Sequence, residues 1–167
     1  MNINIEKNSN SNVLVVAAHA DDEVLGCGGT IARHVANGDK VHVLIMSDGV
    51  SSRENSNNIK KRESEAIESA KILGIMPPTM LSLPDNKMDS IPILDITKMV
   101  EKVLYEFKRS IVYTHHGGDL NVDHSLTNRA VMTACRPIPG SSVHSIYCFE
   151  ILSSTGWGDS ETSKSFN

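Results

Sequence analysis

The sequence has few of the features on which several common protein classes depend. Its 167 residues include three cysteines, Cys27, Cys135 and Cys148, too few and too scattered for a disulfide framework or a Cys-x-x-Cys metal knuckle. No apolar run approaches the roughly 20 residues of a membrane-spanning helix, and no signal-peptide pattern opens the chain. The net charge of −4 leaves no broad basic surface for a nucleic-acid backbone. We therefore expect a cytoplasmic protein with no membrane span and no nucleic-acid partner.

The length and the hydrophobic content favour a single domain. With 167 residues, 40% of them hydrophobic, the chain can bury one sizeable core. The first dozen residues are rich in Asn and Ser, so we expect a flexible tail over residues 1–12 and one domain over residues 13–167. Aromatic residues make up 4% of the chain, and Trp157 is the obvious platform for stacking on a sugar.

Apolar runs alternate with helix-like segments along the chain. The run VLVVAA at residues 13–18 contains no polar residue, which is typical of a strand covered on both faces. The same reading gives strands over residues 13–18, 41–46, 79–83, 111–115 and 143–151, and helices over residues 24–35, 60–73, 94–107 and 126–134. This alternation predicts an α/β fold, a Rossmann-like three-layer sandwich with a mostly parallel central sheet.

Two loops at the ends of predicted strands carry many polar side chains. One is HADDE at residues 19–23, and the other lies within THHGGDLNVDH at residues 114–124. Ligands of open α/β sheets bind beyond the carboxyl ends of the strands, where neighbouring loops diverge. If the strands over residues 13–18 and 111–115 are neighbours, these two loops face each other.

Together the two loops can supply the ligands of a catalytic metal. A catalytic zinc usually has three protein ligands drawn from His, Asp and Glu, with water in the fourth position. His19, Asp22 and His124 form such a set, and Asp21 is left to face the water. Capping of the next helix by Asp22 or Glu23 is the ordinary alternative for a single acid after a strand. The combination of His-x-Asp-Asp-Glu with a second His- and Asp-rich loop favours the metal.

A second ligand set also fits the residue types. His19, Asp21 and His124 satisfy the two-histidine, one-carboxylate triad of non-haem iron(II) oxygenases, and this set would leave Asp22 without a role. Such triads are usually carried on all-β barrels. The predicted alternation of strands and helices argues against this alternative.

Other polar residues favour ordinary structural roles. His34 and His42 have no partner acid near them in the predicted helix and strand, and the Lys-Lys-Arg cluster at residues 60–62 is typical of a solvated helix face.

The glycines at positions 26, 28 and 29 do not form a dinucleotide-binding motif. They lie inside a helical pattern, and Ile31 replaces the last glycine of such a motif. We expect these glycines to permit close packing of the helix.

The segment AHADDE resembles the AHPDDE motif of the LmbE-like, or PIG-L, family of zinc-dependent N-deacetylases. The segment THHGGDLNVDH is similar to the second metal motif of that family, and the resemblance runs from about residue 13 to about residue 157. It implies a Rossmann-like fold, a bound Zn²⁺ and removal of acetyl from an N-acetylated amino sugar. It also places the family's metal ligands on His19, Asp22 and His124 and its general base on Asp21.

The sequence departs from the family pattern at three points. Ala20 stands where proline is usual, which loosens the turn without removing a chemical group. Asn121 stands where many members have a histidine that steadies the oxyanion, although the form D-x-N-x-D-H also occurs in the family. Members commonly continue with a further strand and helix, whereas this chain stops at Asn167, so we expect a truncated or short member that lacks part of the substrate pocket.

Hydrolysis of an amide at a zinc ion predicts roles for the other polar residues of the two loops. Asp21 takes a proton from the metal-activated water and returns it to the departing amine. The negative charge on the former carbonyl oxygen is stabilised by Asn121 through its amide or by His115 through its ring, and the sequence leaves this choice open. Asp123 is expected to orient a histidine as a supporting carboxylate.

Sugar recognition is expected from the other loops at the same edge of the sheet. Asp48, Arg53 and Asp85 each follow a predicted strand, and Asp85 resembles a family position in the segment LPDN. A non-catalytic, sugar-binding member of the family is a further alternative, because of Asn121 and the short end of the chain. The sequence leaves open which acetylated sugar is bound and whether the chain forms a homo-oligomer.

Overall fold

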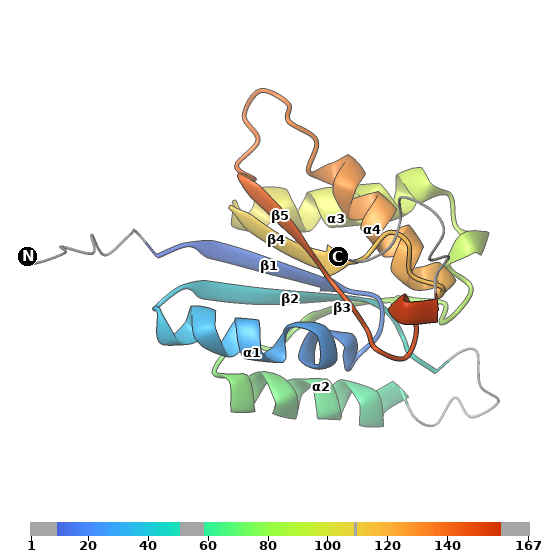
Figure 1. Ribbon diagram of the computed structural model, residues 1–167, viewed down its shortest axis with the longest axis horizontal. Helices are drawn as coiled ribbons and strands as arrows, with labels where there is room; N and C mark the ends of the chain where they lie inside the picture. The colour runs from blue at the N-terminus through green and yellow to red at the C-terminus, as the bar shows by residue number, and fades with distance from the viewer. Residues whose placement is uncertain (1–9, 51–58, 109, 158–167) are drawn as a thin grey trace, which may run out of the picture.

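The computed structural model describes residues 10–50, 59–108 and 110–157. Within them, five parallel strands form one sheet in the order β3-β2-β1-β4-β5 (Figure 1). The strands are β1 (Asn12–Ala17), β2 (Lys40–Ser47), β3 (Thr79–Leu83), β4 (Ile111–His115) and β5 (Ser145–Phe149). The predicted parallel α/β fold is therefore confirmed.

Helices cover both faces of the sheet. Figure 1 shows α1 and α2 on one face and α3 and α4 on the other. Their bounds are α1 (Asp22–Ala36), α2 (Ile59–Leu73), α3 (Ile93–Phe107) and α4 (Val122–Ala134), with short 3₁₀ turns η2 (Met88–Ser90) and η3 (Thr155–Trp157). No described helix is long and apolar enough to cross a bilayer. The three layers of the predicted sandwich are all present.

The central strand β1 shows why its sequence is apolar without alternation. Leu14 and Val16 belong to the core that includes α3 and α4, while Val13 and Val15 belong to the core that includes α1 and α2. All four side chains are at most 1% exposed. Helices cover both faces of β1, so each of its side chains meets an apolar layer.

The order of the strands reverses beside β1. The chain runs outward through β2 and β3 and then returns to place β4 on the other side of β1. In the parallel register Val13 pairs with Ile111 and Val16 pairs with Thr114. The carboxyl ends of β1 and β4 therefore lie side by side, and the crevice beyond such a reversal is where open α/β sheets bind ligands. The two polar loops face each other there.

Two helices begin earlier than their apolar pattern predicted. Helix α1 begins at Asp22 rather than at residue 24, and α4 begins at Val122 rather than at residue 126. Asn121 caps α4, since its side-chain oxygen accepts the N–H groups of Asp123 at 2.9 Å and His124 at 3.4 Å. The first turns of both helices are polar, so hydrophobic periodicity could not detect them.

The chain joins the sheet slightly earlier than predicted. Residues 1–9 of the predicted tail lie outside the described residues, but Asn12 already belongs to β1. The N–H of Ser11 donates to a carboxylate oxygen of Asp39 at 2.7 Å. The last residue assigned to the tail is therefore part of the central strand, and Ser11 is hydrogen-bonded beside the start of that strand.

Gly26 lies where α1 meets β5. A Cβ atom at this position would overlap the ring of Phe149, so a residue with any side chain would have to displace that ring. This confirms the close-packing role for Gly26. No described atom lies within 4 Å of a Cβ built at Gly29, so close packing does not explain that glycine.

Candidate metal centre

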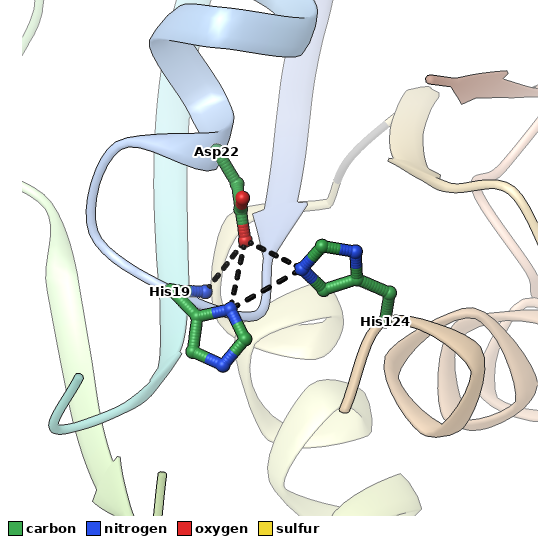
Figure 2. Close-up of side chains that lie close together, drawn as sticks. All are labelled: His19, Asp22 and His124. Carbon is green, nitrogen blue, oxygen red and sulfur yellow. Dashed lines mark hydrogen bonds and ion pairs between the residues drawn. The ribbon is translucent and has the colours of Figure 1, made fainter. Parts of the chain in front are cut away.

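Three side chains from the two loops meet beyond the carboxyl ends of β1 and β4 (Figure 2). The Nδ1 atom of His19 lies 3.2 Å from Oδ2 of Asp22 and 3.2 Å from Nε2 of His124. The same Nε2 lies 3.3 Å from Oδ2 of Asp22. Ligand atoms held about 2.0–2.1 Å from a tetrahedral zinc lie about 3.3 Å from one another. The triangle therefore fits three corners of such a site.

Each histidine of this triangle has its other ring nitrogen next to a carboxylate. The Nε2 atom of His19 lies 3.1 Å from Oδ2 of Asp123, and the Nδ1 atom of His124 lies 3.2 Å from Oδ1 of Asp119. Such contacts fix the ring orientation and direct the remaining nitrogen toward a metal. Asp123 thus lies against His19 rather than against its chain neighbour His124.

Asp119 is a site residue that the sequence reasoning did not select. Its carboxylate accepts the N–H of Asn121 at 2.8 Å and the hydroxyl groups of Ser154 at 3.0 Å and Thr155 at 2.5 Å. Burial acts to raise its pKa, but hydrogen bonds with His124 and Thr155 lower the pKa of Asp119 to about 2. The available signal was the first position of the D-x-N-x-D-H pattern, five residues before His124.

Carboxylates outnumber imidazoles around the triangle. Asp22, Asp85, Asp119 and Asp123 each place an oxygen within 3.3 Å of a ring nitrogen of His19 or His124. Even with both imidazoles protonated, two negative charges among these six groups lack a positive counterpart. This excess of negative charge would attract a divalent cation.

The close contacts between imidazoles and carboxylates explain the pKa shifts of His19 and Asp22. Burial acts to lower the pKa of His19, but hydrogen bonds with Asp123 and Asp22 raise it to about 10. Burial acts to raise the pKa of Asp22, but hydrogen bonds with His115, His124 and His19 hold it far below its ordinary value. A metal ion bound here would replace any proton on the two ring nitrogens that face it.

His115 lies behind the triangle and not in the cleft. Its side chain is 0% exposed, and its ring stacks on that of His124 with centroids 4.0 Å apart and planes 17° apart. Its Nε2 atom accepts the N–H of Ala18 at 2.9 Å and lies 3.4 Å from Oδ2 of Asp22. His115 therefore supports two of the convergent side chains from the sheet side.

Asp21 is the carboxylate on the open side of the site. Its side chain is 52% exposed, and its Oδ2 atom lies 3.7 Å from a guanidinium nitrogen of Arg62 on α2. Burial and the neighbouring charge of Asp22 raise the pKa of Asp21, while Arg62 opposes the shift. A carboxylate with a raised pKa in contact with solvent suits proton transfer.

A cleft of about 300 Å³ opens over the triangle. Around the three convergent residues its lining includes Asp21, Arg62, Asp85, Asn86, Asn121 and Ser154. Arg62 is the second residue missed from the sequence, where it was grouped with two lysines on a solvated face. Lys60 and Lys61 are indeed exposed, but the Arg62 side chain is 33% exposed and reaches the cleft.

The residues predicted for sugar contacts are distributed unevenly. Asp85 lines the cleft, and its side chain lies 3.2 Å from Nε2 of His19. Asp48 and Trp157 are not among the described residues that line the cleft. An oxygen of Asp48 instead accepts the N–H of Val50 at 2.9 Å. Arg53 lies outside the described residues.

The two histidines predicted to be structural lie away from the cleft. His42 stacks on Phe107 with ring centroids 4.6 Å apart. The interpretation that His34 lacks a partner acid is wrong, because its Nδ1 atom lies 2.6 Å from Oδ2 of Asp39. Its Nε2 atom lies 3.0 Å from the hydroxyl of Tyr113. Asp39 follows the helix by a tight turn, which helical spacing did not reveal.

Fold and site together define a class: an α/β protein with a His-Asp-His cluster that could hold a metal ion, at the reversal of a parallel sheet. Comparison with known proteins gives the family. The family model described as "PIG-L: GlcNAc-PI de-N-acetylase" matches residues 14–135. The chain belongs to the PIG-L family, as the resemblance of its two motifs implied.

One curated relative supports this assignment in sequence, and two solved structures share the fold. The chain is 31% identical over 139 residues to the "Uncharacterized deacetylase YaiS" of Escherichia coli, covering 79% of this chain and 72% of that protein. The conserved protein TT1542 of Thermus thermophilus matches with a TM-score of 0.69 at 25% identity, over 82% of this chain. The N,N'-diacetylchitobiose deacetylase of Pyrococcus horikoshii matches with a TM-score of 0.70 at 23% identity, over 85% of this chain. This chain spans 64% and 56% of the lengths of those two solved structures.

The same fold also carries another chemistry. The 4-carboxy-2-hydroxymuconate hydratase of Pseudomonas putida KT2440 matches with a TM-score of 0.61 at 26% identity, over 74% of this chain and 55% of that one. Fold alone therefore does not determine the reaction, which has to be argued from the site.

Proposed function

We propose that this protein is a zinc-dependent hydrolase that removes the acetyl group from an N-acetylated amino sugar. The observation that carries the proposal is the triangle of His19, Asp22 and His124 with the exposed carboxylate of Asp21 beside it. Membership of the PIG-L family and the similarity to YaiS support the deacetylation. The family's description as a GlcNAc-PI de-N-acetylase supports an N-acetylglucosamine unit as the group recognised.

The three convergent atoms, Nδ1 of His19, Oδ2 of Asp22 and Nε2 of His124, would hold the metal ion. Bound by these atoms, zinc would supply two effects: a pKa of about 7 for its water molecule and polarisation of the amide carbonyl. Asp123 and Asp119 each hold the far side of one imidazole, so both rings present their metal-facing nitrogens in a fixed direction.

Asp21 serves as the general base and then as the general acid. Its carboxylate accepts the proton from the attacking water and passes that proton to the nitrogen of the departing amino sugar. Its exposure to the cleft and its raised pKa both suit a group that must bind and release one proton in each cycle.

We assign stabilisation of the oxyanion to Asn121 rather than to His115. The side-chain oxygen of Asn121 is engaged as the cap of α4, which leaves its NH₂ group as the donor in the cleft, where it contacts Asn86 at 3.3 Å. His115 has no exposed side-chain surface from which to reach a substrate. A well-placed donor of this kind is worth about 2.7–4 kcal/mol in the transition state.

Asp85 and Arg62 are the described residues that we assign to sugar contacts. Both line the cleft, and they bring opposite charges from the ends of different elements. Together they can bind hydroxyl groups as acceptor and donor.

Metal analysis combined with an acetate-release assay tests the proposed function. The purified protein is loaded with Zn²⁺ and incubated with N-acetylglucosamine and with simple N-acetylglucosaminides. We expect about one zinc per chain and release of acetate. Zinc-loaded protein that binds these sugars without releasing acetate would support the non-catalytic alternative, and turnover that depends on oxygen would support the iron oxygenase.

A further inference from the structure

The backbone of Asp21 adopts a conformation that side chains rarely take. Its φ angle is 128°, whereas the other non-glycine residues with positive φ in the described chain have values from 45° to 53°. Those smaller angles belong to the left-handed helical region, and 128° lies well outside it. Such a conformation persists only where the surroundings impose it.

Hydrogen bonds hold both peptide units of Asp21. The Oε2 atom of Glu23 accepts the N–H of Asp21 at 2.9 Å. The carbonyl oxygen of Asp21 accepts the N–H groups of Val24 at 3.0 Å and Leu25 at 2.9 Å. The carbonyl contacts are those of any helix start, so Glu23 provides the additional restraint on this residue.

This arrangement changes the usual role of an aspartate at the start of a helix. An Asp in this position normally turns its carboxylate back to accept N–H groups of the first turn. The Asp21 carboxylate accepts none of the described N–H groups of the first turn of α1 and is exposed in the cleft. Glu23 instead binds back to the N–H of the residue before the helix, as the acidic partner of a capping box does.

We propose that Glu23 is a positioning residue that holds Asp21 in this conformation and so aims the Asp21 carboxylate into the cleft. The inference rests on the proposed role of Asp21 as the general base. Glu23 itself is 3% exposed and is not among the described residues that line the metal cleft. It acts through the backbone of Asp21 and does not touch the substrate.

Two substitutions of similar length separate this role from simple filling of space. Glu23→Gln keeps an oxygen that can accept the Asp21 N–H, and Glu23→Met keeps the length but removes the acceptor. In Glu23→Met we expect kcat for acetate release to fall about 10- to 100-fold, because a displaced catalytic group costs up to that much. KM and the bound zinc should stay close to those of the wild type, and Glu23→Gln should keep most of the turnover. Glu68→Met on the exposed face of α2 is the matched control.

A readout without substrate or metal keeps the inference separate from the proposed function. In metal-free protein, amide hydrogen exchange of the Asp21 N–H should be faster in Glu23→Met and unchanged in Glu23→Gln. Wild-type exchange and turnover in Glu23→Met would overturn the positioning role, and so would equal loss of turnover in both variants. Absence of acetate release from the wild type would count against the proposed function, while the exchange measurement would still decide whether Glu23 holds Asp21.

Discussion

Two clusters of histidine and aspartate lie at opposite ends of the same sheet, and they differ in the number of carboxylates around each imidazole. At the end where the strands begin, His34 has one carboxylate partner, Asp39, at 2.6 Å and one hydroxyl partner, Tyr113, at 3.0 Å. At the end where β1 and β4 finish, His19 and His124 face each other at 3.2 Å with four carboxylates around them. Proximity of His and Asp is therefore common to both, and a surplus of carboxylates distinguishes the candidate metal centre.

In the cluster of His34, groups of the protein itself satisfy both ring nitrogens. Each ring nitrogen of His34 meets one partner, so one carboxylate and one hydroxyl satisfy the imidazole. In the second cluster two ring nitrogens and a carboxylate oxygen converge on one another, an arrangement that an external cation would stabilise.

Removal of a ligand from the crowded cluster should have the largest effect. We expect His124→Ala to lose bound zinc and to reduce kcat/KM at least about 1,000-fold, because without the metal the pKa of the reacting water returns toward about 15.7. His34→Ala is the matched control and should retain zinc. Metal content and acetate release measure both variants, and equal metal loss from both would remove the distinction between the clusters.

The exposed carboxylate beside the triangle should be needed for turnover but not for metal binding. We expect Asp21→Asn to retain zinc and to lose about 10²- to 10⁴-fold in kcat, since an amide cannot act as the general base. Asp39→Asn makes the same chemical change in the cluster with His34 and should leave kcat unchanged. Full activity of Asp21→Asn would assign the base to another group.

The supporting carboxylates should affect metal affinity to an intermediate degree. We expect Asp119→Asn to weaken zinc binding about 10- to 100-fold, because the amide no longer fixes the ring of His124 as a carboxylate does. A competition titration with a chelator of known affinity measures this change. Unaltered affinity would show that the contacts of Asp119 serve only the packing of η3.

The smallest effect should come from the cluster of His34 and Asp39, where a substitution changes stability and not turnover. Burial acts to raise the pKa of Asp39, but the hydrogen bonds from His34 and from the Ser11 N–H lower it below its ordinary value. The contribution of this carboxylate to stability is therefore present above its unfolded pKa, near about 3.9, and is lost as the pH falls through the lower folded pKa. Asp39→Asn should cost about 1 kcal/mol at pH 7, the scale of one hydrogen bond, because Asn loses the charge but keeps an oxygen that can accept the Ser11 N–H.

Thermal unfolding of wild type and Asp39→Asn across pH 7 to pH 3 checks this prediction. The difference between their melting temperatures should begin to shrink below about pH 4, where Asp39 of the unfolded chain takes up a proton, and should vanish once the pH is below the lowered pKa of the folded state. A difference that grows toward low pH would contradict the sign of the argument.

The sequence predicted the layers of the fold because the strands are short apolar runs and the helices between them carry apolar residues at helical spacing. It also predicted the convergence of His19, Asp22 and His124, because their segments follow two strands that could be neighbours in a parallel sheet. The roles of Asp119 and Arg62 depend on packing that local patterns do not encode. Asp119 is bound by hydroxyl groups 35 and 36 positions away, and Arg62 reaches Asp21 only because α2 lies beside α1.

The absence of a side chain at Gly26 has a consequence some distance from its own position. Its bare Cα makes room for the ring of Phe149, whose centroid lies 4.6 Å from that of His115. The ring of His115 in turn stacks on His124. A methyl group at position 26 would therefore press on the ring of Phe149 and, through His115, on the imidazole of His124, so the bare backbone of one helix contributes to the placement of a side chain on another.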